Sequence, residues 1–168
     1  MDYAYVSDKQ IEDRLVTTVL NVHELTVRNK KILTSYKGVV VINGGEELVN
    51  RFAVEQHNLI LVHPENHSKE DSLHNRNSGL NSVLCNLARR HNVTIGFSFS
   101  ILLGCKGLGR SKLLGRMRQN VRLCRKYKVR MRLGSFATSS WQLRSDDCLW
   151  SFGRVIGMTP GEVKSALS

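Results

Sequence analysis

The feature that most constrains this sequence is the alternation of short apolar segments with longer amphipathic ones. Residues 38–43 (GVVVIN) and 59–63 (LILVH) are apolar, β-branched runs of the kind found in buried strands. Each is followed by a stretch with helical spacing of apolar residues, at 46–56 and 80–91. The alternation occurs about six times, which predicts an α/β fold with parallel strands and crossover helices.

The remaining elements follow the same pattern. We expect further strands at 3–6, 15–20, 93–100 and 129–136, and helices at 24–36 and 111–128, with a polar loop at 64–79. Leu80, Val83, Leu84 and Leu87 should share the apolar face of their helix. Ser145 should cap a helix that ends at Gly157, and Thr159-Pro160 should open a short last helix.

Two architectures fit this alternation, a barrel and an open doubly wound sheet. In both, ligands meet the loops that follow the carboxyl ends of the strands. A complete eightfold barrel usually needs more than about 200 residues, whereas this chain has 168. A barrel would therefore be incomplete, and we expect one domain over residues 1–168.

Composition narrows the class of protein. A hydrophobic content of 41% with only 2 prolines favours a folded globule over a disordered binder. No apolar run reaches the roughly 18 residues of a membrane helix, and the N-terminus lacks a basic-then-apolar signal. The four cysteines have no C-x-x-C spacing, so we expect reduced thiols and a cytoplasmic location: Cys85, Cys105, Cys124 and Cys148.

Charge is distributed unevenly along the chain. Residues 1–84 hold 9 Lys/Arg and 11 Asp/Glu, whereas residues 85–168 hold 16 and 3. Residues 106–132 contain eleven basic side chains and no acidic one. The strongly positive electrostatic field of this half of the chain favours a dense polyanion as partner, and nucleic acid is the commonest such partner.

The segment GCKGLGRS, residues 104–111, is close to a phosphate-binding loop but has Arg110 where that motif has lysine. Arginine does not replace the lysine, and the expected strands end without the aspartate that would help to hold Mg²⁺. A nucleotide-binding module is therefore disfavoured. A glycine loop before a helix still suits an anion, and Lys106, Arg110 and Lys112 would add charge for an RNA phosphate.

The basic helix that follows is expected to have two faces. Its apolar positions form the core face: Leu113, Leu114, Met117, Val121 and Cys124. Arg118, Arg122 and Arg125 share a second face, where they repel one another unless something negative lies along them.

The polar loop at 64–79 suggests an alternative function. It collects imidazole and carboxylate side chains that could bind a metal: His63, Glu65, His67, Glu70, Asp71 and His74. Their spacing is not diagnostic, and no serine–histidine–acid arrangement is specific. A stand-alone metal-dependent barrel hydrolase therefore stays open as the alternative function.

The segment HNRNSGLNSVLCNLARRHNVTIGFSFSILL, with RMRQNVRLCRKYKV and SFATSSWQLRSDDCLWSFGRVIGM after it, resembles archaeal ribonuclease P protein component 3. This family is the counterpart of the eukaryotic thirty-kilodalton subunit. VVVINGGEELVNRFAVE upstream is similar to the family's strand, double glycine and arginine-bearing helix, so the likeness covers about residues 38–158. Two departures stand out: Ser82 occurs where the family often has histidine, and the N-terminal part is short.

The resemblance implies an α/β, TIM-barrel-like fold, here an incomplete barrel that lacks the first strand–helix unit. It implies a protein subunit that stabilises the catalytic RNA which, with Mg²⁺, removes the 5′ leader of precursor tRNA. Protein component 2 would be its direct partner, beside other ribonuclease P proteins, and no membrane is implied. The protein itself would hold no cofactor, catalytic residue or metal ligand.

Resemblance and charge together indicate the residues that contact RNA. Arg51, Arg76, Arg110 and Arg144 fall at or near places where the family carries basic residues. The full expected set is Arg51, Arg76, Lys106, Arg110, Lys112, Arg116, Arg118, Arg122, Arg125, Lys126 and Arg144.

Overall fold

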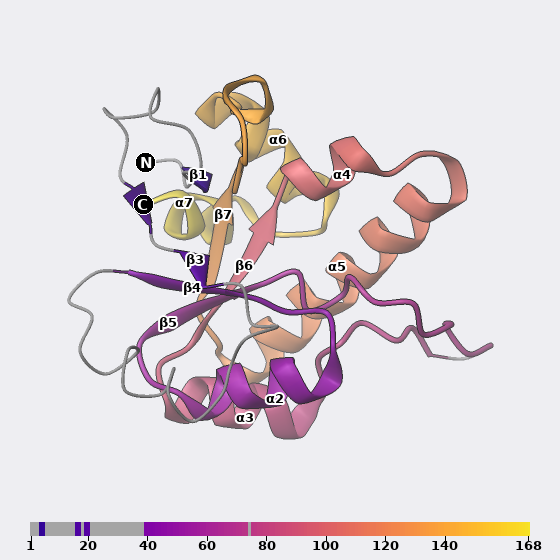
Figure 1. Ribbon diagram of the computed structural model, residues 1–168, viewed down its shortest axis with the longest axis vertical. Helices are drawn as coiled ribbons and strands as arrows, with labels where there is room; N and C mark the ends of the chain where they lie inside the picture. The colour runs from indigo at the N-terminus through magenta and orange to yellow at the C-terminus, as the bar shows by residue number, and fades with distance from the viewer. Residues whose placement is uncertain (1–3, 6–15, 18, 21–38, 74) are drawn as a thin grey trace.

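A computed structural model describes residues 4–5, 16–17, 19–20, 39–73 and 75–168. Its strands form two parallel sheets (Figure 1). A small sheet pairs β1 (Ala4–Tyr5) with β2 (Val16–Thr17). The main sheet contains β3 (Val19–Leu20), β4 (Val40–Asn43), β5 (Leu59–Val62), β6 (Thr94–Ser98) and β7 (Met131–Gly134).

The strands of the main sheet lie side by side in the order in which they occur in the chain. Every neighbouring pair is parallel. A doubly wound sheet would reverse its strand order at one point, whereas a barrel adds each strand in the same direction. The main sheet is therefore an incomplete TIM-barrel-like arrangement, which confirms the predicted fold class. The expected helix at 24–36 falls outside the described residues, so neither this helix nor the expected absence of a first strand–helix unit is tested.

The helices pack mainly against one face of this sheet (Figure 1). They are α2 (Glu47–Glu55), α3 (Ser82–Arg90), α4 (Ser100–Gly104), α5 (Gly107–Tyr127), α6 (Asp146–Val155) and α7 (Pro160–Leu167), with a 3₁₀ turn, η2, at Ser140–Gln142. Ile42, Leu61 and Phe97 lie in the large core shared with these helices. Alternate strand residues form a smaller cluster with Phe136 on the other face, as the period of two requires: Val41, Ile60 and Val62.

The expected helix ends are confirmed. The Ser145 hydroxyl accepts a hydrogen bond from the Cys148 backbone N–H and so caps α6. Thr159 and Glu162 form a reciprocal capping box on α7, with Pro160 at its first position. Gly157, between α6 and α7, has a φ of +90°, a left-handed conformation that glycine adopts without strain.

Two local expectations are wrong. Residues 104–111 do not form a strand-to-helix loop, because the apolar residues after β6 form the short helix α4 and α5 begins at Gly107. Val83 is 64% exposed, and α3 instead buries Leu84, Cys85 and Ala88.

None of the helices within the described residues is long and apolar enough to cross a membrane. All four cysteines are free thiols, and Cys85 and Cys124 are buried.

Candidate nucleic-acid interface

The long helix α5 is the platform of the basic surface. It buries an apolar stripe against the sheet and α3, formed by Leu113, Met117, Val121 and Cys124. Leu114, expected on this face, is only partly buried. The opposite side of α5 is exposed and carries cations, which confirms the two-faced reading of this helix.

Three cations on that exposed side are free to meet a ligand. Arg118, Arg122 and Lys126 follow one another at intervals of four residues, so they form one row along the helix surface. Arg118 and Arg122 have no hydrogen bond or ion pair with any described residue. The Lys126 ammonium lies 5.5 Å from the ring centroid of Tyr127 and has no acidic partner among them. We call these three residues the α5 row.

Arg125, on the same side, is already paired. Its Nε and Nη2 donate to the two carboxylate oxygens of Glu162 at 2.7 Å each, and Nη2 also donates to the Gly157 carbonyl. The hydrogen bond from Arg125 lowers the pKa of Glu162 to about 2, and the Thr159 backbone contributes. Arg125 therefore fastens α7 to the end of α5.

Arg51 and Lys112 also have acidic partners. Arg51 pairs with Glu55 on its own helix at 3.1 Å, and Lys112 pairs with Glu70 at 2.7 Å. Exposed pairs of this kind contribute only about 0–1 kcal/mol. A phosphate could therefore compete for either cation at little cost in stability.

Arg116 lies in the interior, and this revises its assignment as an RNA contact. It is 3% exposed. Its Nε donates to Asp71 at 2.8 Å, its Nη1 donates to the carbonyls of Glu65 and His67, and its Nη2 donates to that of Lys69. The guanidinium thus clasps the polar loop onto α5 and has no surface to offer a ligand.

Two further arginines hold local structure. Arg110 Nε donates to the carbonyls of Leu102 and Cys105 at 3.1 and 2.9 Å and so closes the end of α4. Arg144 Nη1 donates to two nearby carbonyls, and its guanidinium lies 5.2 Å from the ring centroid of Phe99. Arg76 is exposed, and Lys106 is an exposed residue at the start of α5.

The polar loop does not assemble the metal site of the alternative reading within the described residues. His63 Nδ1 lies 2.8 Å from Asn43 Oδ1, and burial lowers the pKa of this imidazole to about 4. Asp71 and Glu70 face cations of α5. No group of three His, Cys, Asp or Glu residues in these ranges could hold a metal ion, and His74 lies outside them.

Burial perturbs the pKa of the Glu65 carboxyl group. The side chain is fully buried, and this raises the pKa of its carboxyl group to about 7. Asn120 Nδ2 donates to Glu65 Oε2 at 3.1 Å, and to the Ser78 carbonyl at 3.0 Å. Sequence reasoning missed Asn120, although its position between Met117 and Val121 places it at the edge of the apolar stripe.

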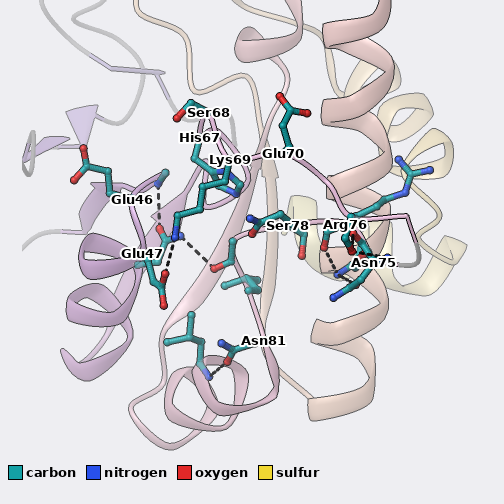
Figure 2. Close-up of a pocket in the computed structure, with 18 of the residues that line it drawn as sticks. Glu46, Glu47, His67, Ser68, Lys69, Glu70, Asn75, Arg76, Ser78 and Asn81 are labelled. Carbon is teal, nitrogen blue, oxygen red and sulfur yellow. Dashed lines mark hydrogen bonds and ion pairs between the residues drawn. The ribbon is translucent and has the colours of Figure 1, made fainter.

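A second feature is a pocket of about 870 Å³ at the carboxyl edge of the sheet (Figure 2). We call it the amide pocket. It lies between the starts of α2 and α3, the polar loop and α5. Its polar lining includes Asn50, His67, Lys69, Asn75, Arg76, Asn77, Ser78, Asn81 and Gln119.

Asn50 fixes the wall of this pocket. It is fully buried, accepts from the Gly45 backbone N–H, and donates from Nδ2 to the carbonyls of Pro64 and Gly79 at 3.1 and 3.2 Å. One amide therefore ties together three loop segments. Sequence reasoning missed it because a lone asparagine in a helix carries no distinctive signal.

Comparison with known proteins identifies the chain. The family model for RNase P subunit p30 matches residues 7–168. The chain belongs to the RNase P subunit p30 family. Its relatives include ribonuclease P protein component 3 of Methanosarcina mazei, 37% identical over 131 residues, and that of Thermococcus kodakarensis, 33% identical over 132 residues. These matches cover 77% and 79% of this chain.

The chain spans about half the length of these relatives, 52% and 57% respectively. In structure it is similar to a chain in the cryo-EM structure of archaeal ribonuclease P with mature tRNA. The TM-score is 0.70 at 26% identity, and the match covers 98% of this chain and 75% of that one. The resemblance predicted from the sequence is confirmed.

Proposed function

We propose that this chain is a protein subunit of ribonuclease P that binds and stabilises the catalytic RNA. In this proposal the RNA and Mg²⁺ carry the chemistry that removes the 5′ leader from precursor tRNA. Protein component 2 is its direct partner. Family membership and the likeness to a chain of archaeal ribonuclease P support this role.

The observation that carries the proposal is the α5 row. Its three cations stand on a rigid helix and have no acidic partner among the described residues, so binding a polyanion costs no existing ion pair. Phosphate contacts of this kind fix position and orientation without reading sequence. Contacts to phosphates and 2′-hydroxyls are also what A-form RNA offers most readily.

The test measures affinity for ribonuclease P RNA as a function of salt. Each phosphate contact contributes about 0.7–0.9 to the slope of log K against log salt concentration. Changing Arg118, Arg122 and Lys126 together to alanine should therefore reduce the slope by about 2–3. A matched control removes the same charge elsewhere, at Arg89, Arg90 and Lys164, and should leave the slope nearly unchanged.

Equal slopes for the α5 variant and the parent would exclude this helix from the RNA footprint. Equal losses in both variants would show that only net charge matters. Arg125→Ala is a separate variant, because it also breaks the contact with Glu162.

A further inference from the structure

The amide pocket is not accounted for by phosphate contacts, because neutral polar groups dominate its wall. Of its charged side chains, Glu47 pairs with Lys69, and Glu70 pairs with Lys112 outside the pocket. Arg76 lies at the side nearest α5, where a Cβ at position 115 would collide with its guanidinium. Gly115 therefore leaves room for this arginine beside the pocket.

Several polar groups of the wall are left with unused hydrogen-bonding capacity. Ser78 is 1% exposed, and its buried hydroxyl has no hydrogen-bond partner among the described residues. Figure 2 shows Ser78 on the wall between Lys69 and Arg76. A buried polar group without a partner costs free energy, so the Ser78 hydroxyl favours a polar ligand.

Two amides add complementary groups. Asn81 caps α3 through Oδ1, which accepts from the Leu84 backbone N–H at 2.9 Å, so its NH₂ group is not used by this bond. Gln119 donates from Nε2 to the Arg76 carbonyl, which leaves its Oε1 as an acceptor. Leu48, which is 79% exposed, supplies apolar surface to the lining.

We propose that the amide pocket binds the base of a nucleotide. The edge of a base presents adjacent donors and acceptors, which side-chain amides pair with directly. Its flat faces pack against apolar side chains, and a volume of about 870 Å³ accommodates a nucleotide. Arg76, at the side of the pocket, can meet the attached phosphate.

The nucleotide can come from two sources. Unstacked nucleotides in single-stranded RNA expose the base edges that such pockets read. This source rests on the proposed RNA-binding function, whereas a free mononucleotide does not. The experiment therefore has one arm for each source.

The first arm uses a single-stranded RNA of about ten nucleotides and an abasic strand of the same length and charge. The key variant is Asn81→Asp, because aspartate caps a helix as well as asparagine but replaces the NH₂ donor with an oxygen. The matched control is Ser82→Asp, which adds the same charge at the next residue, outside the pocket lining. Unchanged thermal unfolding of both variants verifies that α3 is intact.

We expect Asn81→Asp to weaken binding of the base-containing strand about tenfold and binding of the abasic strand much less. Ser82→Asp should affect both strands slightly and equally. Equal effects of Asn81→Asp on the two strands would overturn the RNA assignment, although phosphate binding by the α5 row would still stand.

The second arm titrates the four nucleoside 5′-monophosphates by calorimetry. Binding that Asn81→Asp abolishes would assign the pocket to a free nucleotide, even if no RNA binds. No heat in this arm, together with no base dependence in the first, would refute the proposal.

Discussion

The contribution of Arg116 gives a sharp test of how the polar loop is held. Replacing it with methionine keeps most of the side-chain volume but removes every donor. Asp71, itself 20% exposed, would lose its ion-pair partner and keep only the Asn77 backbone N–H, and the carbonyls of residues 65, 67 and 69 would each lose one donor. Removing one member of a buried ion pair costs about 3–5 kcal/mol.

The expected loss in the free energy of unfolding can be measured as a decrease in the melting temperature, Tm. For a chain of this size, 1 kcal/mol corresponds to about 2–4 °C, so Arg116→Met should lower Tm by about 6–20 °C. Arg122→Met is the matched control, because the same change at an exposed arginine should stay within about 0.5 kcal/mol. Arg116→Lys should fall between them, since lysine keeps the charge but not the planar fork.

The assay combines thermal unfolding with limited proteolysis of residues 64–79. Arg116→Met should expose this loop to cleavage at temperatures where the rest of the chain is folded. At such temperatures it should also leave the salt dependence of RNA binding unchanged, whereas Arg122→Met should reduce it. An Arg116→Met protein as stable as the parent would refute the claim that Arg116 holds the polar loop on α5. A reduced slope of RNA affinity against salt would refute it as well.

Other consequences follow from single groups. The parent should lose stability as pH rises from about 4.5 to 7, because the folded chain retains the Glu65 proton after the unfolded chain has released it. Glu65→Gln should remove this loss. Urea unfolding at a series of pH values measures the free energy of unfolding. Glu162→Gln should remove the loss seen as pH falls from 4.5 to about 2, since its folded pKa is lowered. Gly153→Ala should cost about 1–3 kcal/mol in the same assay, because the new Cβ would lie 2.7 Å from Leu133 and 2.8 Å from Val163.

The elements of the fold were predictable because their signals are local. Strands β4 and β5 are apolar runs bounded by polar or glycine residues, and α6 and α7 carry their own caps. The pattern of elements alone did not decide between a barrel and a doubly wound sheet, since that choice depends on which strands pair, and the barrel was predicted only through the family resemblance. Only the unreversed strand order decides it.

The candidate site was predictable in outline but not residue by residue. Arg118 and Arg116 lie two positions apart in one basic run, yet the first is exposed and the second is buried. A local signal existed, because Arg116 and Asn120 lie next to the apolar positions Met117 and Val121 on the core side of the helix. The hydrogen-bond partners of Arg116, however, are backbone carbonyls of a loop about fifty residues earlier in the chain. No pattern within the helix reveals them.

The same contacts change how the charge asymmetry of the chain should be interpreted. The basic half of the sequence does not face solvent as a block, because Asp71 and Glu70 of the first half neutralise Arg116 and Lys112. These acids contact the side of α5 that faces the polar loop, so the α5 row lies on a different side of the helix. A field focused on one side of a helix orients a polyanion, whereas the same charge spread over the surface would only attract it. The polar loop therefore determines the direction from which RNA would approach, even where the loop itself makes no contact with phosphate.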